Sequence, residues 1–281
     1  MSDTAIVILA IGDEYLAYWQ HFCSRSCHAY AAKHGYDIIV VSEPLDDSPR
    51  AQKRSPAYQK CLVLSQEFSR KYRQIVSLDC DIVINVAESP PIHGQTPTDR
   101  VGGVLSGGHI HEDLRCVLAD RTARVRSDYS RGLQRWENLQ SLAYSSHGLQ
   151  PRNAVIQTGV LVASPAHHRE VFEAIYHADF LTTRSYEQVP LSHAILSNDL
   201  FCPLDTRFNS VFYETALVHY PYLFDESLPD FPRLLSLALQ TEFANNFFLH
   251  FAYDRDMIKA LPLDQSPPSQ SLPSQPGGSK S

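Results

Sequence analysis

The sequence lacks several features that would assign a protein class at once. Its 281 residues contain no apolar run that approaches the length of a membrane span, so we expect no transmembrane segment. They carry a formal net charge of -7, whereas a nucleic-acid-binding protein would need a basic face. No basic residue precedes the first apolar stretch, so we also expect no secretory signal.

The six cysteines lack the spacing of a disulfide framework or of a zinc site. Cys23 and Cys27 lie one helical turn apart, but no second pair completes a set of four metal ligands. We therefore expect buried free thiols in a reducing cytoplasm. Gly-x-Gly-x-x-Gly and Walker sequences are also absent, which argues against dinucleotide sites and P-loops.

What the sequence does contain is a buried-strand pattern interrupted by two acids. The apolar run from Ile75 to Ile84 is typical of a strand buried on both faces, and Asp79 and Asp81 interrupt it. In an extended chain these two side chains point to the same side, with Cys80 facing away. Two carboxylates that close repel each other unless a cation lies between them. The pair therefore predicts a divalent metal whose coordination is completed by ligand oxygens such as those of phosphate.

The order of the expected elements indicates an α/β fold with a mainly parallel sheet. A strand at 5–11, a helix from 15 to 35 and a strand at 37–42 predict a parallel unit with a right-handed crossover. Ligands of such sheets bind at the carboxyl ends of the strands, here near residues 10–13 and 42–44. We expect further strands at 75–84, 101–105, 153–165 and 246–252, and helices over 56–72 and from about 186.

These elements predict a single domain over residues 1–263. The remaining segment, 264–281, is rich in Ser, Pro, Gln and Gly and is expected to be disordered. Within the strand at 153–165, Gly159 predicts a close approach by backbone or ligand. Three polar residues define no site by themselves. His109 and His111 are more typical of a surface loop than of a metal site, and Lys60 alone would be a solvated surface charge.

Together these segments resemble GT-A glycosyltransferases. The likeness is in particular to the glycogenin-like and bacterial lipooligosaccharide galactosyltransferase-like families, which contain an Asp-x-Asp motif and retain the anomeric configuration. It extends from the first strand to His250. It is most specific at 58–64 and 72–84, which resemble the helix lysine and the Asp-x-Asp strand of those families. Further similar segments are 153–162, 187–188, 204–209 and 249–251.

The resemblance implies a Rossmann-like GT-A domain that transfers a hexose from a UDP-sugar. The acceptor would be a hydroxyl of a glycan, glycolipid or protein, and the departing phosphate oxygen would help to take its proton. The enzyme would be cytoplasmic or peripherally bound at the inner face of a membrane. Asp79, Asp81 and His250 would bind a divalent metal, and the imidazole favours Mn²⁺ over Mg²⁺.

The same resemblance assigns other residues to the donor. Lys60 and Asp79 would contact the diphosphate or the donor sugar. Backbone groups of Ala10, Ile11 and Gly12 would hold the uracil and ribose. The further assignments are Gln157 and Thr158 at the donor site, and Glu187 and Gln188 as the catalytic pair beside the donor sugar.

The sequence departs from the family pattern at several of these positions. The C-terminal His-Phe-x-Gly-x-x-Lys-Pro-Trp motif lacks its glycine and its Lys-Pro-Trp in residues 252–259. Arg255 and Lys259 are candidates to replace the missing phosphate contact, although neither has the family's spacing. Glu187 replaces an aspartate, and Gln157-Thr158 replaces Asn-Ala.

Two other function classes remain open. Residues 75–83 also fit the first motif of haloacid-dehalogenase-type phosphatases, in which Asp79 would be the nucleophile and Asp81 the general acid, with Mg²⁺. That family places the motif on its first strand, whereas two expected strands precede it here. The other possibility is a GT-A-like module that binds nucleotide sugars without turnover, because the C-terminal motif is altered.

Overall fold

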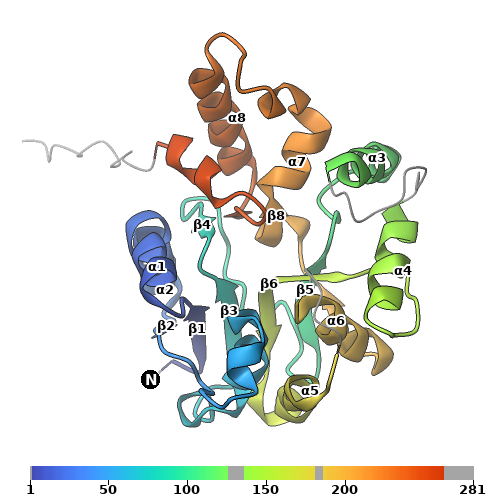
Figure 1. Ribbon diagram of the computed structural model, residues 1–281. Coiled ribbons are helices and arrows are strands. Elements are labelled where there is room, and N and C mark those ends of the chain that lie inside the picture. The colour runs from blue at the N-terminus through green and yellow to red at the C-terminus, as the bar shows by residue number, and fades with distance from the viewer. Residues whose placement is uncertain (1, 126–135, 181–185, 263–281) are drawn as a thin grey trace, which may run out of the picture.

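The computed structural model of the protein describes residues 2–125, 136–180 and 186–262. It confirms the expected α/β fold, a six-stranded, mainly parallel sheet flanked by helices (Figure 1). A smaller, three-stranded sheet lies beside it. The segment 264–281, which we expect to be disordered, lies outside the described residues.

The large sheet has the strand order β2-β1-β3-β6-β5-β7. β6 runs antiparallel to β3 and β5, whereas the other neighbouring pairs of this sheet are parallel. The strands are β1 (Thr4–Leu9), β2 (Asp37–Val41), β3 (Gln74–Asp79), β5 (Val101–Leu105), β6 (Ile156–Ala163) and β7 (Phe201–Pro203).

The small sheet corrects the expectation of one continuous strand over 75–84. The chain turns at Cys80 and Asp81, so β3 stays in the large sheet while β4 (Ile82–Ile84) enters the small one. There β4 pairs antiparallel with β9 (Phe248–His250), which pairs in parallel with β8 (Ser210–Val211). Both halves of the apolar run are buried, but in different sheets.

The first expected helix is confirmed, with an irregularity in its middle. α1 (Asp13–Tyr18) continues through one π-helical stretch, Trp19–Cys23, into α2 (Ser24–His34), which ends at the left-handed Gly35. The helix expected over 56–72 consists of 3₁₀ segments, Pro56–Ser65 and Glu67–Ser69. The remaining α-helices are α3 (Arg115–Val125), α4 (Trp136–Ser146), α5 (Pro165–His177), α6 (Gln188–Ser197), α7 (Phe212–His219) and α8 (Phe231–Asn245).

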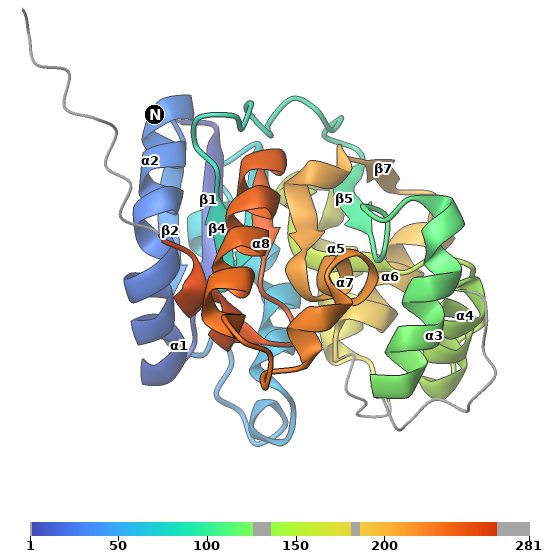
Figure 2. The same cartoon turned by 90° about the horizontal axis from the view of Figure 1, so that it is seen from above.

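Alternation along the central strands divides the hydrophobic core between the two faces of the large sheet. Ile6 and Ile8 of β1 pack on one face with side chains of α2 and α8. Ala5 and Val7 pack on the other face with the Pro56–Ser65 segment, α5 and α6. Seen from above, α1 and α2 lie at one side of the molecule, and α3 and α4 lie at the opposite side (Figure 2).

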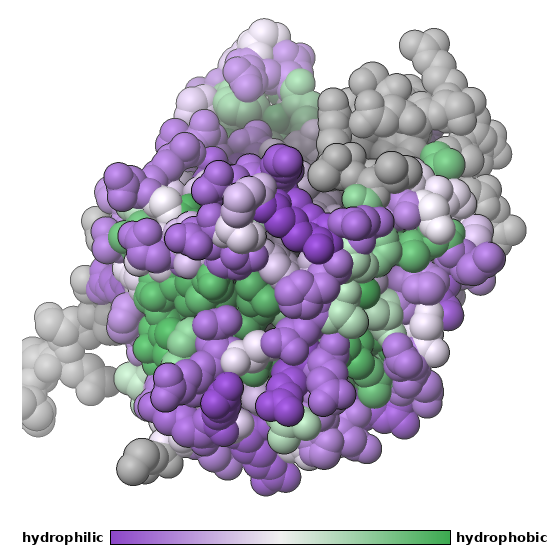
Figure 3. Space-filling model, turned by 60° about the horizontal axis from the view of Figure 1, so that its bottom comes forward, coloured by the Kyte–Doolittle hydropathy of each residue, from purple (hydrophilic) through white to green (hydrophobic). Residues whose placement is uncertain are grey.

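The surface is polar over most of the view from below, which also contains two apolar areas (Figure 3). β2 forms an edge of the large sheet, and its residues Ile38, Ile39 and Val40 are half-buried. Among the described residues, no helix is long and apolar enough to cross a lipid bilayer.

Candidate active site

A cavity of about 370 Å³ opens where the carboxyl ends of β1, β3 and β9 meet the start of α6. Its volume lies in the usual range of small-molecule sites, roughly 300–1,000 Å³. The structure brings most of the predicted site residues together here. Those that line the cavity are Ile11, Lys60, Asp79, Asp81, Gln157, Thr158, Glu187, Gln188 and His250.

Three of these residues form a group that could hold a metal ion. Asp79 ends β3, Asp81 lies in the turn after it, and His250 ends β9. One ligand atom from each lies within 4.8 Å of the others. The acids meet because of the turn rather than by alternation along a strand, since Cys80 between them also lines the cavity.

The buried oxygen of Asp81 fits a cation. Asp81 Oδ1 is buried without a hydrogen-bond partner, although His250 Nε2 lies 3.2 Å away. Burial raises the pKa of Asp81, but the neighbouring His250 imidazole outweighs it and holds that pKa below its usual value. Asp81 therefore presents a buried oxygen that no hydrogen bond satisfies, and carboxylate oxygens together with an imidazole nitrogen suit a divalent ion such as Mn²⁺.

A residue that the sequence analysis did not assign orients His250. The side-chain amide of Asn209 donates to the Gln157 carbonyl at 3.1 Å, so its Oδ1 faces His250 Nδ1 at 2.9 Å. Nδ1–H then donates to Asn209, so Nε2 is the ring nitrogen that faces the two aspartates. Burial lowers the pKa of His250, but the two aspartates outweigh burial and raise it above its usual value. Asn209 lies in the segment 204–209 that resembled a family motif, but its hydrogen bonds depend on contacts distant in the chain.

A close approach does occur at Gly159, but by a side chain and not by the backbone or ligand that the sequence predicted. A Cβ atom at this position would lie 2.3 Å from Cε1 and 2.7 Å from Nδ1 of His250. The imidazole therefore lies directly against the backbone of β6, and only a glycine leaves room for it.

Lys60 is a buried cation at the centre of the site and not a surface charge. Its Nζ lies 2.6 Å from Asp79 Oδ1 and 3.1 Å from Glu187 Oε1, and donates to the Thr158 carbonyl at 3.0 Å. Burial lowers the pKa of this amine, but Asp79 and Glu187 outweigh burial and raise it above its usual value. Lys60 thus remains charged and links Asp79, one of the three candidate metal ligands, to Glu187.

Glu187 and Gln188 lie at the start of α6. Glu187 is the residue immediately before the helix and does not cap it with its side chain. Its carboxylate instead accepts from Thr158 Oγ1 at 3.1 Å and pairs with Lys60. Burial raises the pKa of Glu187, whereas the positive charge of Lys60 lowers it. The resulting pKa of Glu187 is above the usual value of a glutamate.

The predicted nucleotide-binding backbone is only partly in the cavity. Ile11 lines it, whereas Ala10 and Gly12 do not. The amides of Ala10 and Gly12 already donate to the carbonyls of Val41 and Ser42, both at 2.9 Å. Leu9 and the exposed ring of Tyr15, which the sequence analysis did not assign, line the same wall as Ile11.

Of the two basic candidates after His250, only Arg255 lies at the cavity. Its guanidinium lies over the rings of Tyr15 and Tyr18 and pairs with Glu14 through Nη2, while Nη1 is buried without a hydrogen-bond partner. Lys259 pairs with Asp256 at 2.7 Å and does not line the cavity.

His109 and His111 do not form a site together. His111 is exposed, as expected for a loop, but the expectation was wrong for His109, whose side chain is only 6% exposed. Burial lowers the pKa of His109 to about 4, so this imidazole is neutral near pH 7. Among the described residues, the one group that could hold a metal is that of Asp79, Asp81 and His250.

No protein-family model and no curated protein matches the sequence. Among solved structures, the chain is similar to a glycosyltransferase involved in the glycosylation of the major capsid of PBCV-1. The TM-score is 0.51 at 16% identity, over 91% of this chain and 98% of that chain. The protein has a glycosyltransferase fold. The Rossmann-like fold expected from the sequence is thereby confirmed.

A second similar structure is the bifunctional glycosyltransferase WbbM. Its TM-score is also 0.51, at 12% identity and over 92% of this chain. The chain spans 49% of the length of WbbM. At these identities the likeness concerns the fold, so the activity has to be argued from the cavity.

Proposed function

We propose that the protein is a metal-dependent glycosyltransferase that moves a hexose from a UDP-sugar to an acceptor hydroxyl, with retention of configuration. The observation that carries this proposal is the buried Asp81 oxygen without a hydrogen-bond partner, within a group of three side chains that could hold a metal. This group lies in a cavity of small-molecule size within a glycosyltransferase fold. A donor that combines a diphosphate with a sugar suits both the metal group and the cavity.

In this proposal Asp79, Asp81 and His250 hold Mn²⁺ or Mg²⁺. When bound, the ion supplies positive charge that stabilises the leaving diphosphate. Asn209 accepts from Nδ1 of His250 and so directs Nε2 at the aspartates. Arg255 provides a second cation for the diphosphate, because its Nη1 lacks a partner within the protein.

The uracil would lie on the wall formed by Leu9, Ile11 and Tyr15, where aliphatic side chains meet an exposed aromatic ring. This assignment replaces the backbone contacts expected from Ala10 and Gly12. Gln157 and Thr158 line the cavity next to the metal group and would contact the donor sugar.

Glu187 would stabilise positive charge at the anomeric carbon as the bond to phosphate breaks. Lys60 supports this role because it pairs with Glu187 and opposes the rise in the Glu187 pKa that burial causes. Gln188 lies beside it at the first position of α6 and would orient the sugar or the acceptor.

We also propose that the reaction takes place in the cytoplasm or at the inner face of a membrane. The support is that all six cysteines are free and four of them are buried. The phosphatase alternative is weaker, because β1 and β2 precede the strand that carries Asp79. The other alternative is a module that binds nucleotide sugars without turnover, and the experiment below distinguishes it from a transferase.

The test is UDP release from a panel of UDP-sugars with Mn²⁺, measured for Asp81→Asn and for a matched control. Asp81→Asn keeps the shape of the side chain but removes its charge, so we expect UDP release to fall on the order of a hundredfold or more. Asp256→Asn is the control, because Asp256 is the exposed second acid of another Asp-x-Asp triplet and does not line the cavity. Its rate should equal that of the unaltered protein.

Three outcomes contradict the proposal. An unchanged rate in Asp81→Asn removes the metal assignment. Hydrolysis of a generic phosphoester without UDP favours the phosphatase. Tight binding of UDP and Mn²⁺ without turnover of any donor favours the binding module.

A further inference from the structure

Three aromatic rings form a row that begins at the mouth of the cavity. Tyr253 lines the cavity and is 51% exposed. Its ring centroid lies 5.5 Å from that of Tyr213, which in turn lies 5.2 Å from that of Phe224. Phe224 is 39% exposed. We call these three residues the aromatic strip.

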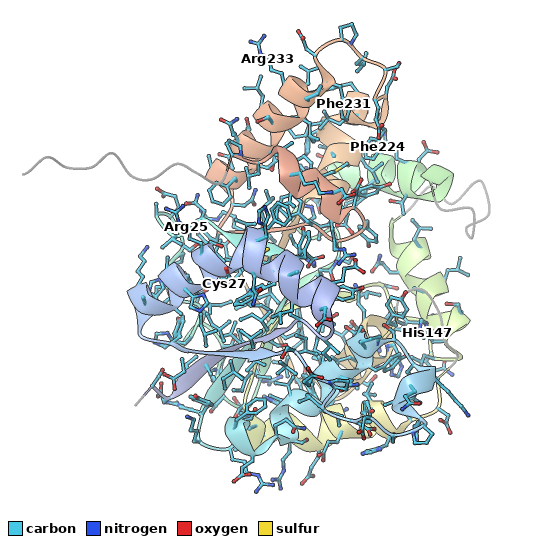
Figure 4. All side chains as sticks on the ribbon, turned by 60° about the vertical axis from the view of Figure 1, so that its left-hand side comes forward. Arg25, Cys27, His147, Phe224, Phe231 and Arg233 are labelled. Carbon is cyan, nitrogen blue, oxygen red and sulfur yellow. The ribbon has the colours of Figure 1, made fainter. Side chains whose placement is uncertain are left out.

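The strip leads away from the cavity. Tyr253 follows β9, Tyr213 lies in α7, and Phe224 ends the 3₁₀ segment Pro221–Phe224. Tyr213 and Phe224 do not line the cavity, so a ligand that touches the whole strip has to extend beyond it. In the stick view, Phe224 lies on the part of the α7–α8 region nearer the sheet, with Phe231 and Arg233 farther out (Figure 4).

The backbone of Tyr253 is held in an unfavourable conformation. Its φ angle is 76°, in the left-handed region that bulky residues seldom adopt. Strain of this kind is concentrated at ligand-binding and catalytic positions. The strained backbone of Tyr253 holds its large ring exposed at the cavity mouth. Burial of the ring would have removed more apolar surface from water.

The chemistry of the strip indicates the class of acceptor. Its rings carry no charge, and acidic Asp225 and Glu226 follow Phe224 as exposed residues, which disfavours an anionic ligand. Aromatic faces carry negative partial charge, and tyrosines combine an apolar face with a polar tip. A pyranose ring matches both properties, because it has an apolar face of C–H groups and a rim of hydroxyls.

We propose that the acceptor is a neutral oligosaccharide that packs the faces of its pyranose rings against the aromatic strip, with its terminal hydroxyl in the cavity. This inference rests on the proposed glycosyl transfer and narrows its acceptor from any hydroxyl to a carbohydrate chain. The donor fills the cavity, and Tyr253 is the point where cavity and strip meet.

The test compares four variants with the unaltered protein by affinity electrophoresis through gels that contain a soluble α-glucan, β-glucan or mannan. Tyr253→Asn removes the ring but tolerates the left-handed backbone, so the fold is retained. Phe224→Ala shortens the strip, and Tyr253→Phe keeps the ring. Leu237→Ala is the control, because Leu237 is an equally exposed apolar residue outside the strip. Circular dichroism checks the fold of each variant.

We expect at least one polysaccharide to retard the unaltered protein. Its association constant should fall about tenfold in Tyr253→Asn and Phe224→Ala, and stay within about twofold in Tyr253→Phe and Leu237→Ala. Retardation by none of the three polysaccharides, or an equal loss in the Leu237 control, overturns the proposal.

Calorimetric binding of UDP with Mn²⁺ to the same variants separates this inference from the proposed function. Phe224 and Leu237 do not line the cavity, so UDP affinity in Phe224→Ala and Leu237→Ala should equal that of the unaltered protein. A protein that binds UDP but no polysaccharide keeps the proposed function and loses this inference. A protein that binds polysaccharide but not UDP loses glycosyl transfer, and the strip is then a carbohydrate-binding surface only.

Discussion

Gly159 decides whether His250 can reach the metal group. Because a Cβ atom there would overlap the imidazole, Gly159→Ala should push the ring away from the aspartates. Overpacking of this kind costs about 1–3 kcal/mol of unfolding free energy. We expect that loss in urea unfolding, together with weaker Mn²⁺ binding in calorimetry.

A double mutant identifies the clash as the cause. His250→Ala removes the ring, so adding Gly159→Ala to it should cost much less stability than Gly159→Ala costs alone. Equal costs in both backgrounds would mean that the glycine matters for the β6 backbone and not for His250.

Asn209 holds the proton of His250 on Nδ1. Asn209→Ala removes this acceptor, and loss of such a partner to a metal-binding histidine lowers metal affinity roughly 10–100-fold. Asn209→Asp keeps an oxygen at this position and should recover part of the affinity. Asn198→Ala, at an exposed asparagine after α6, serves as the control in the same Mn²⁺ titration. An unchanged affinity in Asn209→Ala would contradict the assignment.

At the scale of elements, two arginines complete the end of α5. Arg54 donates to the carbonyls of Tyr176 and Ala178, and Arg50 donates to the carbonyl of His177. These acceptors belong to the last turn, where the helix leaves carbonyls without partners. The side chain of Arg54 is 11% exposed, whereas that of Arg50 is 41% exposed.

The two arginines should therefore differ in their contribution to stability. Arg54→Ala should cost about 1–3 kcal/mol, because it leaves two carbonyls without a charged donor. Arg50→Ala should cost less than about 1 kcal/mol, since water replaces an exposed donor. Urea unfolding of the two variants measures this difference, and equal losses would contradict it.

Much of the sheet could be predicted from local patterns. The strands β1, β3 and β6 follow from apolar runs, because strands buried on both faces need apolar residues throughout. β2 has the same apolar run, although it is a half-buried edge strand. The break at Cys80 and Asp81 could not be predicted, because the residues on either side have the same apolar character. Which sheet Ile82 joins depends on its pairing with His250, which is distant in sequence.

The site could be predicted only where short motifs mark it. Asp79, Asp81 and His250 were assigned from the Asp-x-Asp strand and the family resemblance, and the structure brings them within 4.8 Å of one another. Asn209 lies in the segment 204–209 that resembles a family motif, but its hydrogen bond joins it to a residue 41 positions away and could not be predicted from that segment. Whether the amides of Ala10 and Gly12 are free to bind a ligand could not be predicted either. It depends on the hydrogen bonds that these amides donate at the end of β2.

At the scale of the whole molecule, the metal group draws on both sheets. Asp79 is the last residue of β3 in the large sheet, and His250 is the last residue of β9 in the small one. The chain passes from one sheet to the other between them, through the turn that contains Asp81. Each sheet therefore contributes one of the proposed metal ligands, Asp79 from the large sheet and His250 from the small one.

A cation at this junction would act as a cross-link between two separately hydrogen-bonded layers. Binding of Mn²⁺ should therefore slow amide hydrogen exchange in β9 and β4, while the distant β2 keeps its rate. Exchange followed by mass spectrometry with and without Mn²⁺ measures this, and an equal slowing in β2 would contradict it. Without the metal, the protein would keep both sheets but lose the cross-link between them.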